Sequence, residues 1–189
     1  WWEDEFNALG IGNHFSERGA RTDEYINIFR NLWTEENPEF NGRFYSYGNL
    51  EFSPKPAQKK GIPIWIGGHT KRALRRAAEL GDAWHPIGLR PPASLTPEEL
   101  GRCSEELYSI AHERGRNPGS IQIAFRAPVV FSNTERAILT GNSKQIIEDI
   151  NSYAQVGVDH LTIDFVVSDF ESLMDNLKRV GKEVMPHLN

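Results

Sequence analysis

The residues most able to do chemistry surround two adjacent glycines. The stretch 62–84 reads as an apolar strand, then Gly67-Gly68-His69-Thr70, then a helix that ends at Gly81, and then the start of another strand. Glycine has no Cβ, so the backbone here can approach a ligand closely. Thr70 can cap the helix, whose first N–H groups and positive dipole end point at the same spot. Such an arrangement can bind a phosphate group, and an ordinary tight turn between a strand and a helix is the alternative.

Polar side chains at the ends of later strands form a second set of candidates. Trp84 and His85 end the strand that follows the glycines, and we expect them to face the mouth of a pocket. His85 could contact a substrate or donate a proton, or it could be a packing or surface histidine. Arg126 could hold an anionic group of a substrate or cofactor, or form a salt bridge at the rim. Asp164 could titrate unusually or accept a helix N–H.

Several kinds of site have no signature in this chain. The six histidines show neither a His-Glu-x-x-His pattern nor close spacing to a cysteine, so no metal site is predicted. Gly-x-Ser-x-Gly and Gly-x-Gly-x-x-Gly are both lacking, which argues against a hydrolase nucleophile elbow and a Rossmann fingerprint. The catalytic residues stay unassigned.

Composition narrows the class of protein. The net charge of −5 over 189 residues provides no basic field for nucleic acid. No apolar run reaches the 18 residues or so of a membrane-spanning helix, so no membrane partner is expected. Cys103 is the single cysteine, which rules out an internal disulfide and suits a reducing compartment. We therefore expect a cytoplasmic protein.

The first third of the chain predicts one helix and a long excursion. Thr22 can cap a helix that Asn37-Pro38 ends. Its expected apolar stripe follows helical spacing and consists of Tyr25, Ile28, Phe29, Leu32 and Trp33. Residues 39–60 are rich in turn formers and aromatic residues, which favours a short hairpin within an irregular segment.

The remainder alternates between strands and helices. The predicted pairs are strand 62–66 with helix 70–80, strand 82–86 with a helix from Thr96, strand 121–125 with a helix from Asn142, and strand 158–165 with a helix from Asp169. Thr96 with Glu99, and Asn142 with Gln145, have the spacing of capping boxes. The alternation predicts adjacent parallel strands with helices outside them, in a doubly wound sheet or in part of a (β/α)8 barrel.

The order of these segments resembles one family. The matching segments are Trp1-Trp2-Glu3-Asp4-Glu5-Phe6-Asn7-Ala8-Leu9-Gly10, Glu17 to Tyr25, Leu32-Trp33-Thr34-Glu35, Gly42-Arg43-Phe44-Tyr45, Pro54-Lys55-Pro56, Pro63 to Gly68, Ala73 to Trp84 and Gly157-Val158-Asp159-His160. Together they resemble the bacterial luciferase-like flavin oxidoreductases, and most of all the branch that uses the deazaflavin coenzyme F420.

The resemblance implies a fold and a cofactor site. It implies one luciferase-like domain over residues 1–189, corresponding to the C-terminal part of a (β/α)8 barrel after the fourth strand. The early strands, which help to build the pocket for the flavin-type ring, are expected to be missing. The family binds the cofactor phosphate at the positions of Gly67, Gly68, His69 and Thr70, where many relatives have Asn in place of His69.

The activity that the resemblance implies is hydride transfer between the C5 atom of coenzyme F420 and a small organic substrate. An FMN-dependent monooxygenase of the same superfamily is one alternative. A catalytically silent remnant that binds a phosphorylated ligand or merely dimerises is another. We expect a homodimer, and we expect an incomplete barrel to expose strand edges and an apolar inner face that promote association.

Overall fold

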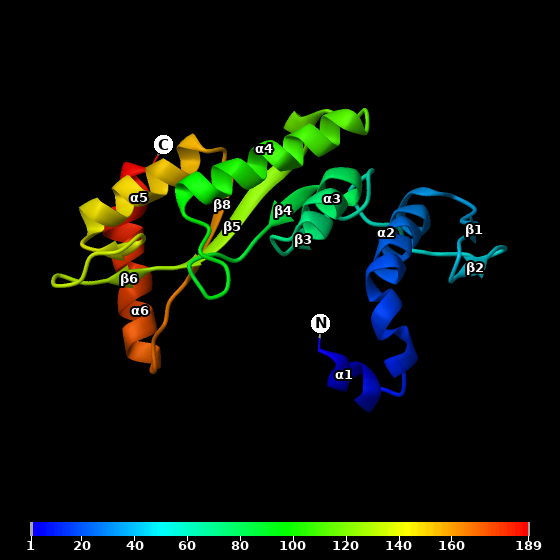
Figure 1. Cartoon of the computed structure of the whole chain (residues 1–189), viewed down its shortest axis with the longest axis horizontal. Coiled ribbons are helices and arrows are strands. Elements are labelled where there is room, and N and C mark those ends of the chain that lie inside the picture. The colour runs from blue at the N-terminus through cyan, green and yellow to red at the C-terminus, as the bar shows by residue number, and fades with distance from the viewer. Residues whose placement is uncertain (1, 189) are drawn as a thin grey trace. The chain divides into compact units, whose positions relative to one another are not determined.

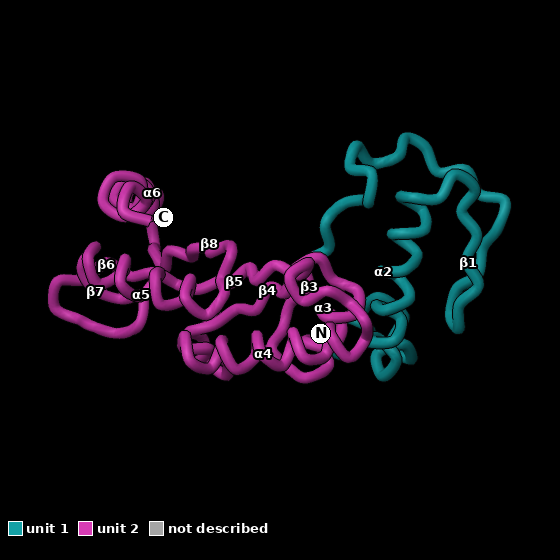
Figure 2. The backbone as a smooth tube through the Cα atoms, turned by 90° about the horizontal axis from the view of Figure 1, so that it is seen from above, with its two compact units in different colours: residues 1–64 teal, residues 65–189 magenta. Residues whose placement is uncertain are grey.

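The computed structural model describes residues 2–188. The chain divides into two compact units, residues 1–64 and residues 65–189, which are coloured separately in Figure 2 and are described here one at a time. The first unit is helical with a small hairpin. The second unit has an α/β fold built on a parallel sheet.

In the first unit, a long helix is followed by the predicted hairpin. The elements are α1 (Glu3–Ala8), a 3-10 turn (Gly12–Glu17), α2 (Arg18–Thr34), β1 (Phe40–Asn41) and β2 (Ser46–Tyr47). The strands β1 and β2 pair antiparallel. Helix α2 begins at Arg18 rather than at Thr22, so the predicted cap is wrong. Thr22 lies inside the helix, and its hydroxyl donates to the Arg18 carbonyl one turn earlier, at 2.8 Å.

The predicted apolar stripe of α2 is buried only in part. Ile28 is buried, whereas Tyr25 and Phe29 are 41% and 43% exposed. The exposed rings stack on their neighbours along the helix, with ring centroids 6.5 Å apart for Tyr25 and Phe29 and 5.6 Å apart for Phe29 and Trp33. Helical spacing predicts which side chains share a face of the helix. It does not predict whether the aromatic side chains on that face stack on one another or are buried under another part of the protein.

The second unit contains the predicted parallel sheet (Figure 1). Its strands are β3 (Trp65–Gly67), β4 (Ala83–His85), β5 (Gln122–Pro128) and β8 (His160–Asp164), and they lie in the order β3-β4-β5-β8. All three pairings are parallel. The adjacency in chain order is confirmed, and the strand ends differ from the prediction by a few residues. Strand β3 starts after Pro63, which has no N–H to donate to a sheet.

Each strand of this sheet precedes a helix with a well-formed N-terminus. The helices are α3 (Lys71–Leu80), α4 (Pro97–Glu113), α5 (Ser143–Gln155) and α6 (Phe170–Arg179). Thr70 and Asp169 cap α3 and α6, and complete capping boxes begin α4 and α5, as the sequence predicts. Further short elements are a 3-10 turn (Pro118–Ser120), the parallel pair β6 (Val130–Phe131) and β7 (Thr140–Gly141), a π-helical turn (Val180–Val184) and a 3-10 turn (Met185–His187).

The two faces of the sheet differ in chemistry. Side chains on the face toward the helices are buried and apolar, including Ile66, Trp84, Ile123, Phe125 and Ala127. Figure 2 shows α3 and α4 together on one side of β3, β4 and β5. Register places a second set on the opposite, inner face: Trp65, His85, Gln122, Arg126, Thr162 and Asp164.

The inner face is therefore not the apolar surface that the sequence analysis expected. Alternate residues of a strand point to opposite faces. The large apolar residues of these strands lie mainly on the face covered by helices. The inner face carries charged and aromatic side chains instead.

Candidate functional site

The glycine turn, residues Gly67–Thr70, joins the carboxyl end of β3 to α3. Gly68 has a φ of +94°, in the left-handed region that favours glycine, and an added Cβ there would lie 3.2 Å from the Cβ of Ala73. The hydroxyl of Thr70 accepts the N–H of Ala73 at 3.3 Å. The Thr70 cap is confirmed, whereas the left-handed conformation of Gly68 was not among the sequence-based predictions.

The start of α3 is electropositive. The first N–H groups of a helix have no acceptor within it, and the helix dipole adds partial positive charge at that end. Lys71 and Arg72 are exposed beside these groups, as is His69. The turn can therefore present backbone N–H groups and cationic side chains to one anionic group.

Trp84 stabilises the glycine turn from beneath. Its side chain is fully buried on the helix side of the sheet, and its indole Nε1–H donates to the carbonyl of Gly68 at 2.7 Å. The position of Trp84 at the end of its strand predicts that it faces the mouth of a pocket. The structure instead places it under the turn, because in β4 it is the neighbouring residue, His85, that points to the inner face.

His85 lies on the inner face directly beside the turn. It is the register partner of Gly67, and its Nδ1 contacts the carbonyl of Ala124. A carbonyl oxygen only accepts hydrogen bonds, so Nδ1 carries the hydrogen and Nε2 of the neutral ring is an acceptor. The ring of Trp65 packs against His85 with centroids 5.3 Å apart. A ligand at the glycine turn would thus meet a histidine of fixed tautomer.

Arg126, Asp164 and Arg90 form what we call the arginine cluster. The Nε and Nη2 atoms of Arg126 lie 3.0 Å from the Asp164 carboxylate, and Nη2 of Arg90 lies 3.4 Å from it. The sequence alone indicates Arg126 and Asp164 as separate candidates but gives no indication of Arg90. No local signal could have identified Arg90, because it belongs to the irregular loop between β4 and α4.

The sequence-predicted residues fall into two groups along one edge of the sheet. Gly67, Gly68, Trp84 and His85 come together at the ends of β3 and β4. Arg126 lies near the carboxyl end of β5, beside β8, where Thr162 is its register partner. Carboxyl edges of parallel α/β sheets are the usual place for ligands.

The first unit holds a separate polar network that joins α2 to the hairpin segment. Nη1 of Arg21 donates to the Tyr45 hydroxyl at 3.1 Å, and Nη2 pairs with Glu17 at 3.0 Å. The Tyr25 and Tyr45 hydroxyls share a hydrogen bond. Hydrogen bonds from Tyr25 and then Arg21 lower the pKa of Tyr45, whereas the hydrogen bond to Tyr45 raises the pKa of Tyr25. The network anchors the hairpin to α2.

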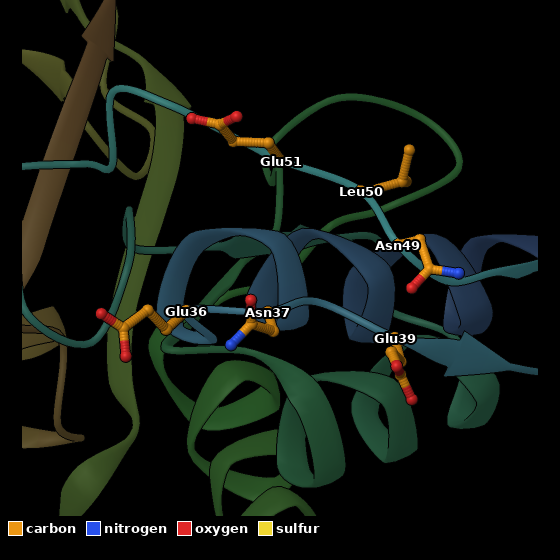
Figure 3. A pocket seen from close by; sticks show the side chains of 6 residues that line it. All are labelled: Glu36, Asn37, Glu39, Asn49, Leu50 and Glu51. Carbon is orange, nitrogen blue, oxygen red and sulfur yellow. The ribbon is translucent and has the colours of Figure 1, made fainter.

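A pocket of the first unit is acidic and contains none of the predicted site residues. It has a volume of about 580 Å³ and is shown in Figure 3, lined by Glu36, Asn37, Glu39, Asn49, Leu50 and Glu51.

Within residues 2–188, no three His, Cys, Asp or Glu side chains gather closely enough to hold a metal ion. The same residues include no helix long and apolar enough to cross a membrane.

The sequence matches proteins of one group. A family model described as luciferase-like monooxygenase matches residues 1–140. An uncharacterized protein of Mycobacterium bovis is 37% identical over 116 residues, covering 61% of this chain and 36% of that protein. The FMNH2-dependent dimethylsulfone monooxygenase of Pseudomonas putida is 27% identical, covering 74% of this chain and 37% of that protein. The chain thus spans little more than a third of the length of these relatives.

The fold agrees with the sequence match. The structure of an F420-dependent secondary alcohol dehydrogenase superposes with a TM-score of 0.74 at 15% identity, covering 93% of this chain and 63% of the other. The α/β fold of the second unit of this chain, with a parallel sheet and outer helices, is that of the luciferase-like barrel enzymes. The family model covers well over half of the chain. The chain therefore belongs to the luciferase-like monooxygenase family.

Proposed function

We propose that the chain forms part of an oxidoreductase that moves a hydride between coenzyme F420 and a small organic substrate, with a phosphate of the cofactor held at the glycine turn. The observation that carries this proposal is Gly68 at a φ of +94°, at the carboxyl end of β3 and before the capped start of α3. Family membership and the fold of an F420-dependent alcohol dehydrogenase support it.

The residues present fit a phosphate group. Gly68 leaves open the space that a Cβ would fill, and the N–H groups at the start of α3 have no acceptor within the helix. Lys71 and Arg72 supply positive charge at the same end. A bound deazaflavin would supply the hydride-accepting and hydride-donating carbon. This chain orients its phosphate, and His85 offers a hydrogen-bond acceptor on the adjoining inner face.

An FMN-dependent monooxygenase is the second candidate function, because a relative at 27% identity is FMNH2-dependent. Both cofactors carry a phosphate that the turn could bind, so the turn does not distinguish them. Reduced FMN reacts readily with oxygen, whereas the reduced deazaflavin reacts poorly. Oxygen consumption with each reduced cofactor therefore separates the two functions.

The deciding experiment is a fluorescence titration of the chain with F420 and with FMN, followed by oxygen-electrode measurements on the cofactor that binds. The proposal predicts saturable F420 binding and no oxygen consumption. Binding of FMN alone, with oxygen uptake, would favour the monooxygenase. Binding of neither cofactor would contradict both functions and favour the silent remnant.

We further propose that the chain associates as a homodimer. Among the described residues, β3 and β8 each have a neighbour on only one side, and an unpaired strand edge tends to pair with another chain. Sedimentation velocity tests this proposal. A single species with the mass of one chain, 21.5 kDa, would contradict it.

A further inference from the structure

The arginine cluster carries more positive than negative charge. Two guanidinium groups face one carboxylate, and the side chains of Arg90 and Arg126 remain 49% and 42% exposed, whereas Asp164 is 17% exposed. Asp164 engages Nε and Nη2 of Arg126. Within residues 2–188, Nη1 of Arg126 donates to no other group. The cluster therefore keeps a net positive charge and unused donors directed away from its own carboxylate.

The loop that carries Arg90, residues 86–96, is fixed to β5 at Arg126 itself. The Gly88 N–H donates to the Arg126 carbonyl at 2.9 Å, and the Arg126 N–H donates to the Pro86 carbonyl at 3.0 Å. A ligand that contacts both arginines would consequently not need to order the loop first.

Further contacts hold the loop internally and to α5. Arg90 and Ala93 exchange backbone hydrogen bonds of 3.0 and 2.8 Å, and the hydroxyl of Tyr153 donates to the Leu95 carbonyl at 2.9 Å. Leu89 and Leu95 have φ values of +53° and +48°, which leucine rarely adopts. Backbone strain of this kind persists where the surroundings over-determine it, often at ligand sites.

A cavity adjoins the cluster. It has a volume of about 720 Å³, and Arg90 lines it. Its other lining residues are mostly apolar, with three polar ones, Ser94, Thr96 and Thr140; the apolar ones are Leu89, Pro91, Pro92, Ala93, Pro128, Ala137 and Ile138. Arg126 and Asp164 do not line the cavity, but Pro128, which does, is the register partner of Asp164 and lies two residues after Arg126 on the same face of β5, so the cavity adjoins the ion pair. The cavity thus combines apolar walls with one cationic end.

We propose that Arg90 and Arg126 bind the anionic group of the substrate, an organic carboxylate or sulfonate whose apolar body occupies this cavity. Guanidinium groups suit such planar or tetrahedral oxyanions because they donate parallel hydrogen bonds. Asp164 keeps the guanidinium of Arg126 in place and neutralises part of its charge. A substrate class for the proposed oxidoreductase follows from this site, and calling the bound anion a substrate rests on that proposed function.

Calorimetric titration of the 189-residue chain with benzoate, benzenesulfonate and benzamide tests the proposal. Both anions should bind, and Arg126→Met and Arg90→Met should each weaken benzoate binding about tenfold. Neutral benzamide should show no such change between variants. Arg114→Met is the matched control, because Arg114 forms a single ion pair with Glu79 at 3.1 Å and does not line the cavity.

Asp164→Asn is a second test that does not depend on the arginine variants folding, because it retains both arginines. It should bind benzoate more tightly than the native chain, whereas a purely structural ion pair predicts no gain. Unchanged benzoate affinity in folded Arg126→Met, an equal loss for benzamide, or no benzoate binding at millimolar concentration would each overturn the proposal.

The same variants are titrated with F420 and FMN. If benzoate binding depends on the arginines but neither cofactor binds, the result would support the anion site and contradict the proposed function. Cofactor binding without arginine dependence would contradict the anion site alone.

Discussion

The glycine turn and the arginine cluster lie along one edge of the same sheet, but they offer positive charge in different ways. The turn offers backbone N–H groups and a helix dipole, and Gly68 leaves open the space that a Cβ would fill. The cluster uses two guanidinium side chains against one carboxylate. Backbone donors are fixed by the fold, whereas side-chain donors must be held by other residues.

This difference determines which residues matter. At the turn, the important residues are Gly68 and the groups that fix its carbonyl, above all Trp84. At the cluster, they include residues outside the contact itself, such as Tyr153, which holds the loop carrying Arg90. The comparison predicts that substitutions at one site leave the other unaffected.

The largest effect is expected from Gly68→Val. Valine would place a side chain in the turn and would strain a backbone at a φ of +94°. Cofactor binding, measured by fluorescence titration, should weaken tenfold or more. Benzoate binding should not change.

Gly115→Val is the matched control for Gly68→Val. Gly115 also has a positive φ, +72°, and an added Cβ would meet no atom within 4 Å. Both variants should lose about 1–2 kcal/mol of unfolding free energy from backbone strain. An equal loss of cofactor affinity in the two variants would show that general destabilisation, not the turn, causes the effect.

The next largest effect is expected from Trp84→Phe. This variant loses the hydrogen bond to the Gly68 carbonyl and part of a fully buried ring, which should cost about 1–3 kcal/mol of unfolding free energy. Cofactor binding should weaken about threefold to tenfold because the turn is less well fixed. Urea unfolding and cofactor titration measure the two effects.

Phe125→Leu provides the comparison for Trp84→Phe. Phe125 is equally buried on the same face and packs against Tyr153, away from the turn. It should lower stability without changing the cofactor dissociation constant. A Trp84→Phe variant that loses stability but keeps full cofactor affinity would argue against a role for Trp84 in positioning the turn.

The two sites also differ in how far the sequence could predict them. The glycine turn is formed by consecutive residues, so residue types and helix capping sufficed to place Gly67 to Thr70 at the junction of β3 and α3. The arginine cluster joins a loop and two strands. Arg126 and Asp164 could be picked out singly, but their contact depends on the parallel register of β5 and β8.

Trp84 shows a second limit of sequence reasoning. Strand β4 has three residues, and side chains alternate between faces, so an error of one residue reverses the side on which each lies. Predicting that β4 ends near Trp84 and His85 therefore did not establish which of them faces the inner side of the sheet. The parallel order of the strands was easier to predict because it follows from the alternation of strands and helices.

A smaller effect is expected from Tyr153→Phe, which tests how the arginine cluster is held. Removing the hydroxyl leaves the Leu95 carbonyl without this donor and should cost about 1 kcal/mol of unfolding free energy. Benzoate binding should weaken about threefold through the loop that carries Arg90. Cofactor affinity should stay constant.

Tyr108→Phe is the control for Tyr153→Phe. Within the described residues, the Tyr108 hydroxyl makes no hydrogen bond. Its removal should change neither benzoate affinity nor stability appreciably. If Tyr153→Phe binds benzoate as tightly as the native chain, the loop holds Arg90 without help from α5.

The smallest effect concerns the end of the same loop, at Thr96, and it depends on pH. The carboxylate of Glu99 accepts the Thr96 N–H at 3.0 Å. This hydrogen bond, with a further one from Ser94, lowers the pKa of Glu99 in the folded chain. A carboxyl group with a lowered pKa stabilises the folded state fully above its unfolded-state pKa, and the contribution is lost as the pH falls through the folded-state pKa.

Glu99→Gln keeps an acceptor for the N–H but has no charge to titrate. The difference in unfolding free energy between the native chain and Glu99→Gln, measured by urea unfolding from pH 7 to about pH 3, should therefore shrink as the pH falls. Glu98→Gln, at an exposed neighbour 4.0 Å from Arg102, controls for the change in net charge. A difference that stays constant across this range would show that the Glu99 charge does not help to anchor the loop, and the holding of Arg90 would then rest on Tyr153 and the backbone contacts to β5.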